Sequence, residues 1–220
     1  MASRKYIFFD LGWTLEDETA AQVDRASKAA AIVRRHGIQT SVATILALQE
    51  EGAKSLESSV FVYALSCLGL ADDQVRAVLR ESRWDKTKLH LYPDAKSTLI
   101  NLKEDHFVGL IANQSPGTKE RLTRYGIHSY FDLISVSDEI GLEKPDPRIF
   151  ELALDKAGCR AEDAWMIGDR LDNDIRPANQ AGWNTIRVLH GYNICQVPRD
   201  ALDQPDYTVA NLSELVPILG

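Results

Sequence analysis

Short, continuous runs of apolar residues alternate along most of the chain with longer stretches whose apolar residues have helical spacing. Runs of this length, rich in aromatic and β-branched residues, are typical of buried strands. They lie at residues 6–9, 107–112, 131–136, 164–167, 184–188 and 207–209. Because helical stretches separate the later runs, the pattern predicts βαβ units and an α/β fold built on a doubly wound parallel sheet.

One long segment near the N-terminus carries no strand signal. Between residues 16 and 90, apolar residues recur at helical spacing in blocks at 20–36, 42–51, 58–68 and 72–79. Gly37, Gly52 and Gly69 follow the first three blocks, and glycine commonly ends helices. The sequence therefore predicts an α-helical bundle at residues 16–90, inserted after the first strand into a core made of residues 1–15 and 91–220.

Composition and charge narrow the function classes. The 220 residues include 45% hydrophobic and 26% charged residues, which is ordinary for a globular protein, and the net charge is −7. An acidic chain is poorly suited to nucleic acid or to an anionic membrane, so neither is expected as a partner. Three cysteines without a pairing pattern and the absence of a recognisable signal peptide or membrane span predict a cytoplasmic protein. The sequence carries no marker of oligomeric state.

Carboxylates follow two of the predicted strands. Asp10 comes directly after the first strand, and Asp169, Asp172 and Asp174 follow the strand at 164–167. Ligands of open α/β sheets bind at the carboxyl ends of the strands, so Asp10 is a candidate nucleophile or metal ligand; an aspartate that only caps the turn is the alternative. Several carboxylates so close together repel one another unless they share a cation, and hard oxygen ligands suit Mg²⁺.

Two further strand ends carry groups that attract anions. Asn113 follows the strand at 107–112, and Ser115 and Pro116 predict a helix start whose amides would attract an anion at that strand end. Lys144 precedes Pro145 after the next strand, where its charge could hold a phosphate or a carboxylate. An ordinary capped helix and a solvated lysine are the alternatives when each feature is taken alone.

In this order, the four strand ends resemble the motifs of the haloacid dehalogenase superfamily of aspartate-nucleophile hydrolases, and the helical insert resembles the cap of its subfamily I. The resemblance implies a Rossmann-like core. It implies that Asp10 is the catalytic nucleophile, that Asp10 and Asp169 ligate Mg²⁺, and that Gly12 ligates the metal through its backbone carbonyl. It also implies that Lys144 steadies the phosphate and the nucleophile, and that Asp174 supports the metal site. The implied substrate is a small phosphorylated metabolite.

The chain departs from the superfamily at two positions. The superfamily's phosphatases usually have a second aspartate two residues after the nucleophile, which protonates the leaving group and later activates water; this chain has Gly12 there. General acid–base catalysis contributes about 10²–10⁴ in rate, so the activity is expected to be low. The second motif usually has serine or threonine, and this chain has Ala112. Phosphate binding at this motif then falls to the backbone near Ala112 and to Asn113, together with Lys144.

The sequence leaves three functions open. The favoured one is a Mg²⁺-dependent phosphatase acting through an aspartyl-phosphate, with Glu16 or Asp17 replacing the missing acid or a good leaving group making it unnecessary. The second is a catalytically inactive protein on the same fold that binds a phosphorylated ligand or has a regulatory role. The third is a phosphonatase or a dehalogenase, because both resemble this chain in lacking the second aspartate. The insert carries no signature of the substrate.

Overall fold

The computed structural model describes residues 4–220 and divides into two compact units. The core unit comprises Met1–Glu16, Leu91–His190 and Pro198–Gly220, and the helical unit comprises Asp17–His90 and Gly191–Val197. The first three positions of the core unit lie outside the described residues. Residues 191–197, which the sequence placed in the core, group with the helices instead.

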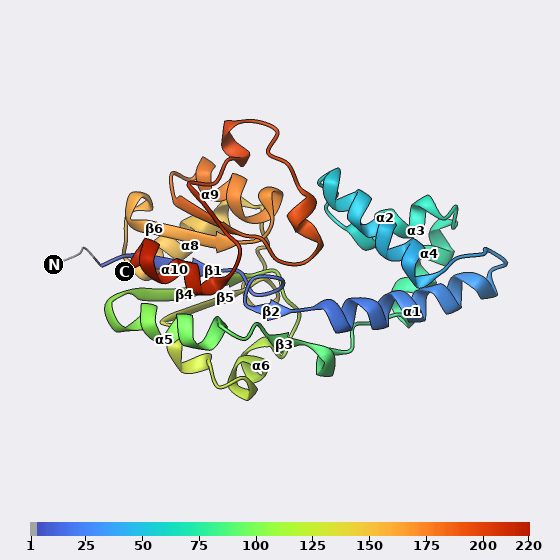
Figure 1. Ribbon diagram of the computed structural model, residues 1–220, viewed down its shortest axis with the longest axis horizontal. Coiled ribbons are helices and arrows are strands. Elements are labelled where there is room, and N and C mark those ends of the chain that lie inside the picture. Colours follow the sequence, from blue (N-terminus) through green and yellow to red (C-terminus); the bar gives the residue numbers. More distant parts are fainter. Residues whose placement is uncertain (1–3) are drawn as a thin grey trace. The chain divides into compact units, whose positions relative to one another are not determined.

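A parallel sheet forms the centre of the core unit (Figure 1). Within residues 4–220, six strands lie in the order β5-β4-β1-β6-β7-β8, and every neighbouring pair is parallel. The strands are β1 (Tyr6–Phe9), β4 (Phe107–Ala112), β5 (Leu133–Val136), β6 (Ala164–Gly168), β7 (Asn184–Val188) and β8 (Tyr207–Val209). Every strand predicted from the apolar runs is present, and the predicted α/β fold with a doubly wound, Rossmann-like sheet is confirmed.

Helices cover both faces of this sheet, and alternate side chains of β1 pack against the helices on each face. The helices are α5 (Ala95–Asp105), α6 (Thr118–Arg124), α8 (Pro147–Ala157), α9 (Arg176–Gln180) and α10 (Leu215–Leu219). Ile7 and Phe9 belong to a cluster with residues of α5, α6 and α10, whereas Phe8 belongs to a cluster with residues of α8 and α9. All three side chains are fully buried, so β1 lies at the centre of the core unit.

The register of β1 brings several strand ends to one edge of the sheet. Phe9 pairs with Leu110 of β4 and with Ile167 of β6. The backbone amide of Asp10 continues this ladder and donates to the carbonyl of Ile167 at 2.8 Å. The residues that follow β1, β4 and β6 therefore lie at the carboxyl edge of the central strands, where α/β proteins bind their ligands.

The predicted helix start after β4 is wrong. The helix α6 begins at Thr118 instead of Pro116, because Gly117 takes a left-handed conformation with a φ of 87° directly before it. Residues 113–117 are therefore a loop, and Asn113 does not lie at a helix N-terminus. A helix of this length and position does not provide the anion site that the sequence predicted there.

Some short elements were not predicted from the pattern. They are the strands β2 (Glu16–Asp17) and β3 (His90–Leu91), the helix α7 (Ser137–Ile140) and the π-helical turn η4 (Leu171–Ile175). The strands β2 and β3 form a separate two-stranded sheet at the two chain connections of the helical insert. Elements of two to five residues are too short to produce a recognisable period.

The helical unit is built on one apolar cluster. Its helices are α1 (Thr19–Arg35), α2 (Val42–Lys54), α3 (Val60–Cys67) and α4 (Asp72–Glu81). The cluster includes Ala30, Val33, Ile45, Phe61, Leu65 and Val78. Residues 191–197 join this unit at α2, where the Cys195 thiol donates to the carbonyl of Glu50 at 3.6 Å. Among the helices of residues 4–220, none has the length and apolar character needed to cross a membrane.

A buried aspartate fixes the connection between β7 and β8. The carboxylate of Asp203 is fully buried and accepts from Arg199 at 2.6 Å and from Arg176 at 3.0 Å. We expect Asp203→Asn to lower the free energy of unfolding in urea by about 1–3 kcal/mol at pH 7, because charge-assisted hydrogen bonds are lost. Asp200→Asn is the control, since this half-exposed carboxylate also contacts Arg176 and should contribute less than about 1 kcal/mol.

The pH dependence of that stability difference follows from the same arginines. Hydrogen bonds from Arg199 and Arg176 hold the pKa of Asp203 well below its ordinary value of 3.8. As the pH falls, the unfolded chain therefore takes up this proton before the folded protein does. The difference between wild type and Asp203→Asn should be constant above about pH 5 and should narrow below about pH 4. A difference that widens in acid would contradict this assignment.

Candidate active site

Asp10 opens a tight loop that its own backbone holds in place. The amides of Leu15 and Glu16 both donate to the carbonyl of Leu11, at 2.9 and 2.8 Å. The amide of Trp13 donates to the carbonyl of Glu16 at 2.8 Å, and Trp13 takes a positive φ of 55°, which is uncommon for a residue with a side chain. The loop thus fixes the backbone next to Asp10, whose side chain keeps 14% of its surface exposed.

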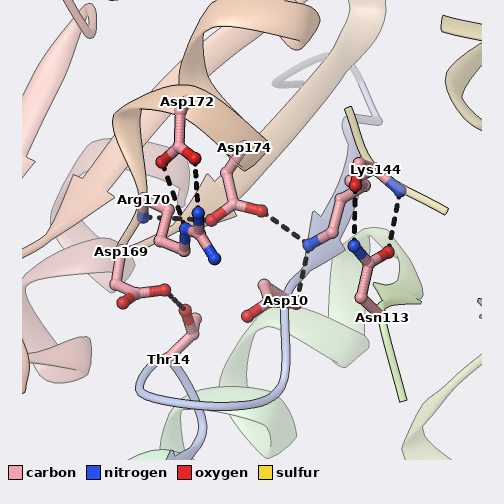
Figure 2. Close-up of polar contacts among 8 residues, drawn as sticks. All are labelled: Asp10, Thr14, Asn113, Lys144, Asp169, Arg170, Asp172 and Asp174. Atoms are coloured by element: carbon pink, nitrogen blue, oxygen red, sulfur yellow. Dashed lines mark hydrogen bonds and ion pairs between the residues drawn. The ribbon is translucent and has the colours of Figure 1, made fainter. Parts of the chain in front are cut away.

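Lys144 joins two of the predicted site carboxylates (Figure 2). Its Nζ donates to Oδ1 of Asp10 and to Oδ1 of Asp174, at 2.6 Å in both cases. Asn113 fixes the lysine backbone through two bonds of 2.7 Å, one from its Nδ2 to the Lys144 carbonyl and one from the Lys144 amide to its Oδ1. The side chain of Lys144 is 2% exposed, so the lysine is enclosed with its partners. Residues predicted from four separate strand ends therefore meet in one place.

Asp174 lies in the π-helical turn after β6, and each oxygen of its carboxylate accepts a hydrogen bond. Its Oδ1 accepts from Lys144, and its Oδ2 accepts the backbone amide of Arg170 at 3.0 Å. Gly168 makes room for it, since a Cβ added at Gly168 would lie 2.5 Å from the Cβ of Asp174. The side chain of Arg170 pairs with Asp172 (Figure 2).

Asp169 links the end of β6 to the loop after β1. The hydroxyl of Thr14 donates to Oδ1 of Asp169 at 3.5 Å, and both side chains are buried (Figure 2). The Nε of Arg187, in β7, donates to the backbone carbonyl of Asp169 at 3.4 Å. Thr14 was not predicted as a site residue. Its position four residues after Asp10, in the same loop, was the signal that could have identified it.

Burial and mutual repulsion shift the pKa values of the central groups. Burial raises the pKa of Asp174 to about 6, and the charge of Asp10 adds to this rise while Lys144 opposes it. Burial lowers the pKa of Lys144, but the carboxylates of Asp10 and Asp174 outweigh burial and raise its pKa overall. The lysine is therefore charged at neutral pH. One ammonium group does not balance the carboxylates around it, and the site keeps an excess of negative charge.

The same carboxylates could hold a metal ion. Asp10, Asp169 and Asp174 each offer an oxygen atom, and these atoms lie within 4.8 Å of one another. Hard oxygen ligands with an excess of negative charge match the preferences of Mg²⁺. The donor set of the site thus fits the cation that the sequence predicted.

The residues predicted to bind phosphate differ in what they offer. Ala112 ends β4, and its methyl group is fully buried in the core, so it offers no polar side chain. The amide group of Asn113 already holds the backbone of Lys144. Gly12 lies in the loop after Asp10 and forms an isolated backbone bridge with Glu16. Of the three predicted phosphate ligands, Lys144 alone presents a charged side chain to Asp10.

The carboxylates suggested as replacements for the missing acid have other partners. Glu16 is fully buried, and its Oε1 lies 2.7 Å from Nε of Arg121. An oxygen of Asp17 accepts the backbone amide of Thr19 at 2.8 Å. Both contacts are structural, and the replacement of the missing acid by Glu16 or Asp17 stays a prediction.

Comparison with protein families gives a match over most of the chain. The model of the haloacid dehalogenase-like hydrolase family matches residues 5–182. A glyceraldehyde 3-phosphate phosphatase of Methanocaldococcus jannaschii is 32% identical over 98% of this chain and 96% of its own length. The glyceraldehyde 3-phosphate phosphatase of Methanopyrus kandleri is 40% identical, but that match spans 58% of this chain and 56% of the relative.

Solved structures share the fold. The magnesium-bound crystal structure of a putative hydrolase of the same family from Bacillus subtilis has a TM-score of 0.67. Its sequence is 23% identical to this chain, and the match covers both chains completely. At this identity the likeness concerns the fold, and the helical insert lies within the matched length.

Proposed function

Because the chain belongs to the haloacid dehalogenase-like hydrolases, we propose that it is a Mg²⁺-dependent phosphatase of a small phosphorylated metabolite that acts through an aspartyl-phosphate on Asp10. The observation that carries this proposal is the contact of the Lys144 ammonium with both Asp10 and Asp174, beside the buried Asp169. This arrangement combines a nucleophile, a fixed positive charge and hard oxygen ligands. Phosphoryl transfer to a carboxylate needs these groups in one place.

The chemistry on Asp10 takes two steps. One oxygen of Asp10 attacks phosphorus, and the bond from phosphorus to the leaving oxygen breaks, so that the leaving group departs and takes a proton from water. Water then attacks the phosphorus of the aspartyl-phosphate, which releases inorganic phosphate and restores the carboxylate. Lys144 remains charged throughout and offsets the repulsion between the phosphate and Asp10. A Mg²⁺ ion held by Asp10, Asp169 and the Gly12 carbonyl would stabilise the charge on the phosphate oxygens.

Asp174 and Asn113 act by positioning Lys144. Both oxygens of Asp174 are bonded, one to the lysine and one to a backbone amide, so we assign it to orienting Lys144 and supporting the metal site. Asn113 fixes the lysine backbone in the same way. Contacts to the phosphate then come from the Lys144 ammonium and from the backbone of the loop at residues 113–117. Ala112 adds no side-chain contact.

Gly12 limits the range of esters that the protein hydrolyses quickly. Glycine can neither protonate a leaving oxygen nor activate the water of the second step. Esters with a good leaving group, such as aryl or acyl phosphates, need little protonation in the first step. We therefore expect aryl phosphates to react faster than alkyl phosphates, and the aspartyl-phosphate to break down slowly.

The relatives suggest a first natural compound to test. Two of them are named as glyceraldehyde 3-phosphate phosphatases, so we propose glyceraldehyde 3-phosphate as the first metabolite of the panel. Its leaving group is an alkoxide, and its expected turnover by this chain is slow because of Gly12. Turnover above that of other alkyl phosphates would identify it as a preferred substrate.

The proposed function is tested with substrates of different classes. Purified protein is incubated with an aryl phosphate, with glyceraldehyde 3-phosphate and with a 2-haloacid, each in Mg²⁺ and in a chelator. We expect phosphate release in Mg²⁺ alone and no halide release. Halide release without metal would identify a dehalogenase instead. No turnover, together with a melting temperature raised by inorganic phosphate, would identify a phosphate-binding protein that has lost the chemistry.

A further inference from the structure

Glu16 and Arg121 form an ion pair that is fully enclosed in the core unit. The Nε of Arg121 lies 2.7 Å from Oε1 of Glu16, and their side chains are 1% and 0% exposed. Neither charged residue has a part in the mechanism proposed above. The pair joins the loop that follows Asp10 to the helix that follows the loop at residues 113–117.

Stability alone is a poor explanation for this pair. Removing two charges from water costs about as much as their attraction returns, and buried ion pairs are often replaced by apolar side chains of similar volume without loss of stability. Burial raises the pKa of Glu16 and Arg121 opposes this rise, so desolvation and pairing act against each other here too. The position of the residues that the pair holds in place explains it better than its net contribution to stability does.

Arg121 extends the pair to the loop after β4. Its Nη2 donates to Oε1 of Gln114 at 2.9 Å. The hydroxyl of Ser137 holds the same residue from the other side, since it accepts the Gln114 amide at 3.1 Å and donates to the Gln114 carbonyl at 3.3 Å. Gln114 is thus fixed through its side chain and its backbone. Asn113, the residue before it, holds Lys144.

These contacts close a ring around the candidate active site. From Asp10 the chain leads to Glu16, whose carboxylate holds Arg121. Arg121 holds Gln114, and its neighbour Asn113 holds Lys144. The Nζ of Lys144 donates to Oδ1 of Asp10 at 2.6 Å, which closes the ring.

We propose that the Glu16–Arg121 pair is a positioning device that fixes the loop at residues 113–117 relative to Asp10 and thereby sets how tightly the site holds a phosphate group. This inference rests on the proposed function, which places the phosphate at that loop. The pair acts through Gln114 and touches neither the phosphate nor Asp10 itself. Metal binding should depend on the pair less than phosphate binding does, because Asp169 lies on the other side of Asp10, after β6.

A double variant separates positioning from stability. Glu16→Leu combined with Arg121→Met replaces both charges by apolar side chains of similar size, and its melting temperature should equal or exceed that of wild type. The KM for an aryl phosphate and the inhibition constant of inorganic phosphate should both rise about tenfold, while kcat and the Mg²⁺ concentration for half-maximal rate change little. Gln114→Leu keeps the ion pair, cuts its link to the loop and should show the same increase in KM.

The matched control removes an exposed ion pair that joins α6, the helix of Arg121, to α7. Lys119 and Glu139 lie 2.7 Å apart, with side chains 46% and 41% exposed. The double variant Lys119→Met and Glu139→Leu should leave KM and phosphate inhibition unchanged. If both double variants behave like wild type, the Glu16–Arg121 pair has no positioning role.

A binding measurement keeps this test independent of turnover. The melting temperature is measured at increasing concentrations of inorganic phosphate in Mg²⁺. The phosphate concentration that gives half of the maximal rise in melting temperature should be about tenfold lower for wild type than for the double variant Glu16→Leu and Arg121→Met. Equal half-maximal phosphate concentrations in the two proteins would overturn the inference and leave the proposed function intact. Wild type that neither hydrolyses esters nor responds to phosphate would instead overturn the proposed function, and this inference with it.

Discussion

Asp10→Asn is expected to reduce Mg²⁺-dependent hydrolysis of an aryl phosphate by at least about a thousandfold, because an amide is not a nucleophile and cannot form the aspartyl-phosphate. Asparagine has nearly the same shape, and it removes one negative charge from a site that has too many. The variant should therefore fold, with a melting temperature no lower than that of metal-free wild type. The rate of release of the aryl alcohol is the measurement.

Asp172→Asn is the matched control for that prediction. Asp172 belongs to the same acidic segment as Asp169 and Asp174, but its carboxylate pairs with Arg170. Its variant should keep most of the wild-type rate. Full activity of Asp10→Asn, or equal losses in both variants, would remove Asp10 from the chemistry.

Gly12→Asp is expected to raise the rate on alkyl phosphates by about 10²–10⁴, because it restores a general acid and base two residues after the nucleophile. Gly12 is not among the glycines of residues 4–220 that take a positive φ, so the backbone permits a side chain there. The gain should be smaller on an aryl phosphate, whose departure needs little protonation. Initial rates on one alkyl and one aryl ester measure both effects.

Gly12→Asn is the control that distinguishes the effect of an acid at this position from the effect of any side chain of that size. Asparagine has the size of aspartate but cannot exchange a proton, so Gly12→Asn should not raise the rate on either ester. A folded Gly12→Asp variant with the wild-type rate on alkyl phosphates would overturn the argument that an acid is missing. A similar gain in both variants would point to a conformational effect of any side chain at this position.

The parts of the fold and the candidate site that the sequence predicted depend on local pattern and on one rule of topology. Each continuous apolar run became a strand, because residues buried on both faces of a sheet are apolar along their whole length. Parallel strands present their carboxyl ends at one edge, so Asp10, Asp169 and Lys144 were expected to meet there, and they do.

The features that the sequence did not predict come from the conformation of one glycine and from contacts between distant residues. Ser115 and Pro116 form a local helix-start signal, but the left-handed Gly117 delays the helix to Thr118. Pairing of Glu16 with Arg121 joins positions far apart in the chain, and no periodicity reveals a partner at that distance. Residues 191–197 carry no pattern that assigns them to the helical unit, and their contacts with α2 exist only in the folded chain.

Rapid mixing of the wild-type protein with an aryl phosphate shows whether Asp10 is phosphorylated in a Mg²⁺-dependent reaction and whether the phosphate then leaves slowly, as expected because Gly12 supplies no acid or base. Release of the aryl alcohol is followed from the first turnover, in Mg²⁺ and in a chelator. We expect a fast release of about one equivalent per protein molecule, then a slower steady rate, with both phases lost in the chelator. Release that is unaffected by removing the metal, or a steady rate without a preceding fast phase, would contradict this expectation.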